Sequence, residues 1–360
     1  MCGAGEPLVK DGVAIHMYAC NAPMADRAFC NADGEMLIVP QLGVLHVTTE
    51  LGKLCVAPGE IVVVPRNIYF AVSPSDASAA QGGCRGYVCE VFATRGFILP
   101  DLGPIGANGL AEPRDFLHPL ATYEDRHCPN GFRITTKYAG KIFETTRDYS
   151  PWDVVAWHGT FTPYKYDLAR YHAVNTVTVD HPDPSIFTVL TCPSGEPGVA
   201  VCDFVIFPPR WMCAQNTFRP PYFHRNVMAE FMGLIHGSYD AKEAGEEGFA
   251  PGGASLHPQG TPHGPDADCF AAASSCDTSK ARPRTERRCS EPPPPARSDS
   301  ARSARPRASP SSSTAASRSC SRPPPCSRSR PPPSSPRSCS RTTPSAGTAS
   351  RAHRSRTTPE

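Results

Sequence analysis

The segment RPPYFHRNVMAEFMG carries a histidine and a glutamate, His224 and Glu230, six residues apart. In an extended chain an even separation places both side chains on one face, whereas in a helix the same separation points them well apart. The local composition permits either, but two preceding prolines and the strand-like context favour the extended form. His263, in the segment TPHGPDADCF, can supply a third ligand.

Two histidines and one carboxylate form the ligand set of non-haem iron(II) oxygenases, in which open positions remain for substrate and O2. The same donors also suit zinc or manganese. The spacing by itself has little specificity, because such a pair also occurs in surface ion pairs and capped turns. Other histidines, such as His16, have no acidic or histidine partner at useful spacing, so we interpret them as packing or surface residues.

The elements that must position this cluster have the character of β-strands. Short apolar runs such as MLIVP, GVLHVTT, EIVVVP and GYVCEVF lie between Gly34 and Phe92, punctuated by Gly, Pro and Asp. LIVP and IVVVP are apolar at every position, which predicts burial on both faces. Strand-like runs return over Ser150–Phe207 and Phe223–Ile235, and Asp240–Thr261 is predicted to be a mobile loop. This spacing indicates an antiparallel sandwich or barrel.

Composition narrows the class of protein. The chain has 360 residues and a net charge of +2, but Arg far outnumbers acidic residues beyond about Lys280, so the preceding body is net acidic. An acidic body argues against a nucleic-acid partner, and no apolar run approaches the length of a membrane span. The 16 cysteines are scattered without a C-x-x-C pair, and the first residues lack an apolar signal core. We therefore expect a cytoplasmic protein with reduced thiols.

Several longer motifs resemble the homogentisate dioxygenase family, and they occur in the family's order. They begin with CGAGEPLVKDGVAIH and continue to about Phe270 with FLHPLATYEDR, VVAWHG, TPYKYDL, DPSIFTVLT, DFVIFPPRW, RPPYFHRN, EFMGLI and TPHGPDADCF. The resemblance implies cupin-like β-sandwich or barrel halves. It also implies a homo-oligomer that opens the aromatic ring of homogentisate with O2 to give maleylacetoacetate, in tyrosine and phenylalanine catabolism.

The resemblance also implies roles for individual residues. Iron(II) would be held by His224, Glu230 and His263, and His181 would be the catalytic acid–base group. The residues matching the substrate pocket are Tyr239, His257, Tyr222 and, again, His263. A cupin with another metal and substrate, such as a sugar isomerase, is the alternative from outside the family.

We predict three parts of the chain: an N-terminal sandwich domain at 1–169, an iron-binding cupin-like domain at 170–272 and a disordered tail at 273–360. Both domains are expected to be incomplete, because the family continues at both ends. Such a chain could be an inactive fragment whose N-terminal sheet has an open apolar edge. The Pro/Ser/Arg-rich tail is interpreted as out-of-frame coding sequence; the rival is a basic segment that binds RNA or acidic partners.

Overall fold

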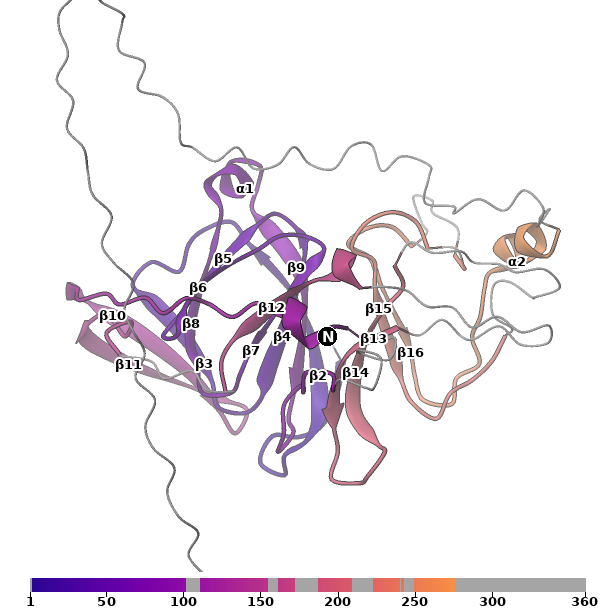
Figure 1. Cartoon of the computed structure of the whole chain (residues 1–360), viewed down its shortest axis with the longest axis horizontal. Helices are drawn as coiled ribbons and strands as arrows, with labels where there is room; N and C mark the ends of the chain where they lie inside the picture. Colours follow the sequence, from indigo (N-terminus) through magenta and orange to yellow (C-terminus); the bar gives the residue numbers. More distant parts are fainter. Residues whose placement is uncertain are drawn as a thin grey trace, which may run out of the picture. The chain divides into compact units, whose positions relative to one another are not determined.

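In a computed structural model, the regular secondary structure of the described residues consists mostly of β-strands (Figure 1). The structure describes residues 2–101, 111–154, 161–171, 187–208, 223–239, 241–242 and 249–275. Over these residues the strands form two large sheets and two separate hairpins. The predicted mainly β fold class is therefore confirmed.

The first large sheet contains six antiparallel strands. They are β1 (Cys2–Glu6), β2 (Asp11–Cys20), β4 (Glu35–Leu42), β7 (Glu60–Val64), β9 (Cys84–Val91) and β12 (Tyr164–Asp167). Their order across the sheet is β1-β2-β9-β4-β7-β12. β4 and β7 thus have a neighbour on each side, so neither forms the open apolar edge expected from the sequence.

The second large sheet also contains six strands. They are β3 (Arg27–Asn31), β5 (Leu45–Thr49), β6 (Gly52–Val56), β8 (Tyr69–Pro74), β10 (His127–Tyr138) and β11 (Lys141–Tyr149). They lie in the order β11-β10-β3-β8-β5-β6, and only the pairing of β10 with β3 is parallel.

Two hairpins follow the sandwich that the two large sheets form. β13 (Phe187–Pro193) pairs with β14 (Ala200–Ile206), and β15 (Glu230–Gly233) pairs with β16 (Ala254–His257). The helices are short: α1 (Asp76–Ala80), α2 (Ala267–Ser274) and the 3-10 turns Pro113–Asp115 and Leu168–Arg170. In the described part of the chain, none of the helices has the length and apolar character to cross a membrane.

The two central apolar strands explain why the sandwich has a core on each face of its first sheet. Alternate residues of a strand point to opposite faces. Ile38 of β4 and Val62 of β7 therefore face the second sheet, where they pack with Val47 and Phe70. Leu37, Val39, Ile61 and Val63 face the other way, against residues of the β13–β14 hairpin. Burial of LIVP and IVVVP on both faces is confirmed.

A buried carboxylate also ties the two large sheets together. Glu90 of β9 is 2% exposed and lies 2.5 and 2.6 Å from the Lys137 ammonium of β10. It also accepts a hydrogen bond from Asn31 Nδ2 at 2.7 Å, and its other oxygen lies 3.1 Å from His16 Nε2. Burial alone would raise the pKa of Glu90, but these partners outweigh it and lower the pKa to about 2.

The structure corrects three expectations. The segment Asp240–Thr261, predicted to be a loop, contains β16, and the run Phe223–Ile235 forms a strand only over Glu230–Gly233. The predicted tail begins inside α2, because that helix continues to Ser274; the rest of it after Ser275 lies outside the described residues. The described cysteines are free thiols, as expected.

Candidate metal centre

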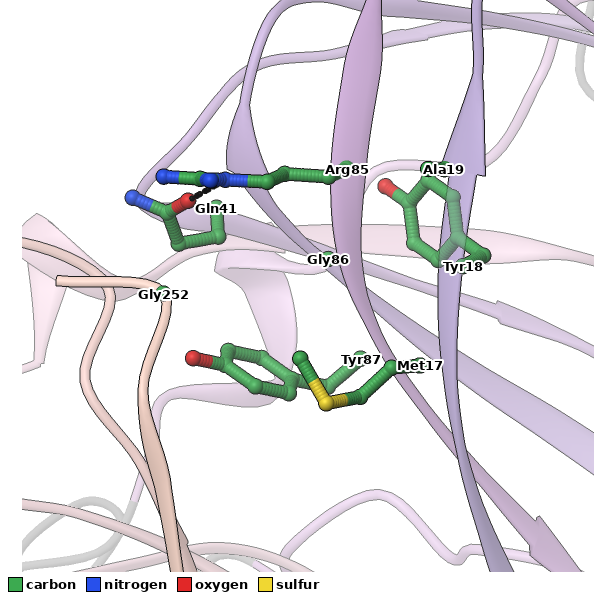
Figure 2. Close-up of a pocket in the computed structure, with 8 residues that line it drawn as sticks. All are labelled: Met17, Tyr18, Ala19, Gln41, Arg85, Gly86, Tyr87 and Gly252. Atoms are coloured by element: carbon green, nitrogen blue, oxygen red, sulfur yellow. Dashed lines mark hydrogen bonds between the residues drawn. The ribbon is translucent and has the colours of Figure 1, made fainter. Parts of the chain in front are cut away.

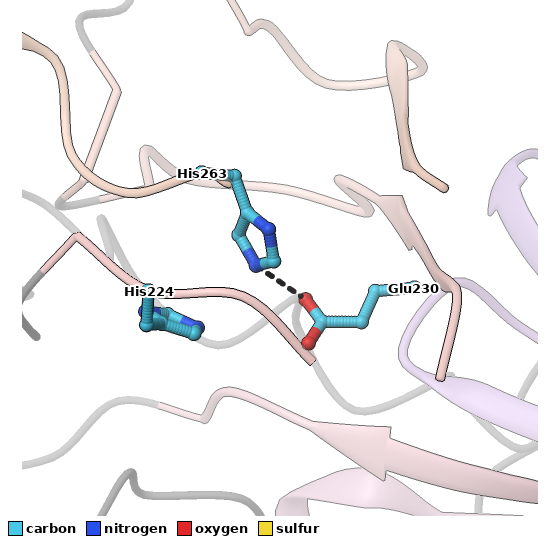
Figure 3. A group of neighbouring side chains, drawn as sticks. All are labelled: His224, Glu230 and His263. Atoms are coloured by element: carbon cyan, nitrogen blue, oxygen red, sulfur yellow. Dashed lines mark ion pairs between the residues drawn. The ribbon is translucent and has the colours of Figure 1, made fainter. Parts of the chain in front are cut away.

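Three side chains predicted to form one site do lie together in the structure (Figure 3). One ligand atom from each of His224, Glu230 and His263 lies within 4.8 Å of the others. The extended form predicted between His224 and Glu230 is wrong, because the chain bends at residues 227–228 and the strand starts at Glu230. The even spacing therefore does not bring the pair together.

Backbone pairing brings the ligands together instead. The His224 N–H donates to the His263 carbonyl at 2.8 Å, and the His263 N–H donates back to the His224 carbonyl at 2.8 Å. In the adjacent hairpin, Glu230 is the register partner of His257. The Gly260 N–H donates to the Asn226 carbonyl at 2.8 Å and joins the two connecting segments. The pairing of His224 with His263 and the pairing of Glu230 with His257 thus determine the geometry of the site.

Both oxygens of the Glu230 carboxylate are held by neighbours. Asn226 Nδ2 donates to Oε1 in a very short contact. His257 Nδ1 lies 3.3 Å from Oε2. His263 Nε2 lies 3.2 Å from the same oxygen. The carboxylate is therefore oriented from two sides while one oxygen faces a histidine ligand.

The environment of His263 provides a test of whether a cation fits. Its Nδ1 lies 2.9 Å from the Thr261 carbonyl, which can only accept, so Nδ1 carries the hydrogen. In the neutral ring Nε2 then presents a lone pair. That atom is buried and makes no hydrogen bond, although Glu230 Oε2 is close enough for an ion pair. Two lone pairs facing each other are stabilised by a positive ion between them.

The separation of these donors also suits one first-row divalent ion. Nitrogen and oxygen ligands bind such an ion at about 2.0–2.2 Å, so two neighbouring ligands lie roughly 3.0–3.4 Å apart. The 3.2 Å between His263 Nε2 and Glu230 Oε2 falls in this range. The rings of His224 and His263 meet edge to face, with centroids 4.5 Å apart. The residues present therefore fit a metal ion.

His257, predicted to line the substrate pocket, directly contacts two of these three residues. Its ring stacks on His263 with centroids 4.2 Å apart, and its Nδ1 faces Glu230. Burial lowers the pKa of His257; the hydrogen bond to Glu230 opposes this shift, and nearby Lys242 adds to it. His257 thus contacts both the Glu230 carboxylate and the His263 ring.

The other predicted site residues are less directly placed. Tyr239 lies in an aromatic group with Phe207 and Phe249, whose ring centroids are 5.9 and 6.0 Å from its own. His181 and Tyr222 lie outside the described residues. Their roles stay predictions.

Sequence reasoning missed Asn226, Lys242 and Ser255. Asn226 stands only two residues after His224, so its position carried a local signal. Ser255 lies two residues before His257 on one face of β16 and required recognition of that strand. Lys242 had no local signal, because its partner Ser255 is 13 residues away.

The sandwich positions the hairpin that carries Glu230. Figure 2 shows Gly252, which lies between the two strands of that hairpin in sequence, at a pocket with Tyr87, Gln41 and Arg85. The Tyr87 hydroxyl of β9 donates to the Gly253 carbonyl at 2.7 Å, and a side chain at Gly233 would come within 2.9 Å of the Tyr87 ring. Gln41 donates from Nε2 to the Ile235 carbonyl at 2.9 Å and accepts from Arg85 Nε at 2.7 Å. These contacts hold both ends of the β15–β16 hairpin connection beside a cavity of about 250 Å³.

The fold and site define a mainly β protein with a candidate mononuclear metal centre built from two histidines and one carboxylate. Comparison with known families matches residues 1–168 to "Homogentisate 1,2-dioxygenase N-terminal" and residues 169–285 to "Homogentisate 1,2-dioxygenase C-terminal". The chain belongs to the homogentisate 1,2-dioxygenase family.

Individual relatives support the same conclusion. The homogentisate 1,2-dioxygenase of Oryza sativa subsp. japonica is 60% identical over 272 residues, which cover 76% of this chain and 56% of the rice protein. The proteins of that name from Homo sapiens and Drosophila melanogaster are 56% and 55% identical, over 76% of this chain and 59% and 60% of their own lengths. The chain thus spans somewhat more than half the length of these curated relatives.

Proposed function

We propose that this chain forms the iron(II) centre of a ring-cleaving dioxygenase that converts homogentisate and O2 to maleylacetoacetate. The observation that carries the proposal is the convergence of His224, Glu230 and His263 in a member of this family. In the reaction both oxygen atoms of O2 enter the product and one ring bond between carbons breaks. The reaction would be a step of tyrosine and phenylalanine catabolism.

Iron(II) would be held by His224, Glu230 and the Nε2 atom of His263, which makes no hydrogen bond. Bound iron(II) would supply a Lewis acid for the substrate hydroxyl and a partner for O2. Two neutral histidines and one carboxylate leave one positive charge on a divalent ion, which favours binding of an anionic substrate. The contacts from Asn226 and His257 would keep the Glu230 carboxylate oriented as a ligand.

His181 would take the hydroxyl proton of homogentisate and so raise electron density on the ring. Tyr239, Tyr222 and His257 would contact the substrate. We further propose that the protein works as a cytoplasmic homo-oligomer, with 1–169 as the sandwich domain and 170–272 as the iron-binding domain. These assignments rest on family membership.

Oxygen uptake with homogentisate is the test. The chain loaded anaerobically with iron(II) should consume O2 only when homogentisate is present. The variant His181→Asn should keep its iron and lose about 10²–10⁴-fold in rate, as expected for loss of a positioned acid–base group. His46→Asn, which changes an exposed histidine on β5, is the matched control and should keep full activity.

Three results would count against parts of the proposal. Iron-loaded chain that consumes no O2 with homogentisate would show that this chain does not carry the activity. Normal turnover in His181→Asn would remove that residue from the reaction. Restoration of activity by manganese(II) or zinc(II) but not by iron(II) would contradict the metal.

A further inference from the structure

A chain of hydrogen bonds runs from a lysine to the glutamate of the candidate metal centre. Lys242 Nζ donates to Ser255 Oγ at 3.2 Å, and Ser255 Oγ lies 3.1 Å from His257 Nε2. The other ring nitrogen, His257 Nδ1, lies 3.3 Å from Glu230 Oε2. The His257 side chain at the centre of these contacts is 12% exposed.

The lysine at one end of this series of hydrogen bonds and the carboxylate at the other determine the direction of every hydrogen bond between them. A carboxylate only accepts, so His257 Nδ1 must carry the hydrogen that faces Glu230. In a neutral imidazole Nε2 is then an acceptor, and the Ser255 hydroxyl must donate to it. A lysine ammonium only donates, so it occupies a lone pair of the Ser255 oxygen and leaves the hydroxyl hydrogen free for His257.

Local structure keeps the three partners in place. Ser255 and His257 are two residues apart on β16, so both side chains lie on the half-buried face of that strand. Lys242 follows Ala241, whose carbonyl accepts the Asp266 N–H at 2.9 Å. The Lys242 ammonium also lies 5.9 Å from the centroid of the Phe249 ring. The cation is thus held near Ser255 from two directions.

We propose that Lys242 and Ser255 are positioning residues, which keep the hydrogen of His257 on Nδ1 and so hold the Glu230 carboxylate in its metal-binding orientation. The inference rests on the proposed role of Glu230 as a ligand. Partners that orient a metal ligand in this way typically change metal affinity by about 10–100-fold. His257 therefore acts on the metal centre through Glu230, in addition to any contact with substrate.

Nitrogen-15 NMR of the metal-free chain tests the protonation pattern directly. In wild type, at a pH where His257 is neutral, its Nδ1 should be protonated and its Nε2 unprotonated, with the signals assigned by their loss in His257→Gln. In Ser255→Ala this preference should weaken, because only the Glu230 carboxylate then favours the hydrogen on Nδ1. Protonation of Nε2 in wild type, or an unchanged pattern in Ser255→Ala, would overturn the proposal. The wild-type measurement does not depend on the folding of Ser255→Ala.

Cobalt(II) affinity tests the consequence for the metal. Ser255→Ala and Lys242→Met should bind cobalt(II) up to about tenfold more weakly, at the lower end expected for groups one step removed from a ligand. Ser255→Thr keeps the hydroxyl and should restore affinity. Gln259→Ala, an exposed change in the next turn, should leave affinity unchanged. Equal affinity in Ser255→Ala and wild type would overturn the positioning role.

The two proposals can fail separately. The NMR pattern is measured without metal or substrate, so it stands even if the chain shows no ring cleavage. Normal iron content and activity, together with a His257 ring protonated on Nε2, would instead contradict only the positioning role of Lys242 and Ser255.

Discussion

The sandwich and the β15–β16 hairpin are stabilised in different ways. In the sandwich, central strands such as β4 and β7 have partners on both sides and are buried on both faces. In the hairpin each strand has one partner, and its side chains are half-buried or exposed. Apolar burial therefore fixes the sandwich, whereas a few polar contacts fix the metal centre. Substitutions in the sandwich should therefore mainly reduce folding stability, whereas substitutions at the metal centre should mainly reduce metal binding.

The largest expected effect on folding comes from Glu90→Ala. The change leaves the Lys137 ammonium, which is 20% exposed, without its carboxylate between the sheets. Removing one partner of a buried ion pair typically costs about 3–5 kcal/mol. We expect a loss of this size in the free energy of unfolding, measured by urea denaturation.

The exposed pair of Arg133 and Glu144, 3.7 Å apart on β10 and β11, provides the control for Glu90. Glu144→Ala should change stability by about 0–1 kcal/mol, because solvent screens exposed pairs. Similar small losses for both variants would contradict the view that a buried carboxylate joins the sheets.

Glu35→Gln should alter how stability depends on pH. Burial raises the pKa of Glu35 to about 7, above the ordinary 4.5, although the Phe97 N–H donates to Oε1 at 2.6 Å. The folded protein therefore binds a proton that the unfolded chain has released between these values. Stability from this group is full below pH 4.5 and is lost as pH rises through 7, by roughly 3 kcal/mol at 1.36 kcal/mol per pKa unit.

Glutamine keeps an oxygen for the Phe97 N–H but cannot ionise. Glu35→Gln should therefore match wild type near pH 4 and exceed its stability at pH 8 by up to about 3 kcal/mol. Unfolding curves at both values measure the difference. A wild-type advantage at pH 8 would mean that the carboxylate is stabilised by a partner other than Phe97.

Tyr87→Phe should affect folding less than Glu90→Ala, and its effect should be concentrated in the β15–β16 hairpin. It removes the hydroxyl that donates to Gly253 and keeps the ring that packs on Gly233. A lost hydrogen bond costs about 1 kcal/mol. Hydrogen exchange of the β15–β16 amides should increase more than that of β4 and β7.

The control for this change is Tyr166→Phe. The Tyr166 hydroxyl is buried without a hydrogen-bond partner, so its removal should leave the β15–β16 amides unaffected. Equal exchange in Tyr87→Phe and wild type would show that the hairpin does not depend on this contact with the sandwich.

The sequence predicts the central sandwich well but misses its polar strands. MLIVP and EIVVVP are apolar at every position because both faces are buried. β11 was missed because nearly all of its nine residues are exposed, so no apolar period marks it. A turn with positive φ at Ala139 and Gly140 connects it to β10, and this local signal is weak without Asn or Asp.

The site shows a similar division. The residue types of His224, Glu230 and His263, together with the family motifs, identify a candidate centre from sequence. The contacts around it depend on how β15 pairs with β16, and a short pattern such as ASLH does not specify that register. The contact of His16 with Glu90 could not be predicted from local spacing either, because the two residues are 74 positions apart in the sequence.

Metal content of the purified chain tests the central claim most directly. After anaerobic incubation with iron(II) and removal of free metal, wild type should retain about one iron per chain, since one set of three ligands supplies one site. His224→Ala, Glu230→Ala and His263→Ala should each lose tight binding, while His46→Ala should retain it. Full iron retention in any two of the three ligand variants would contradict the account.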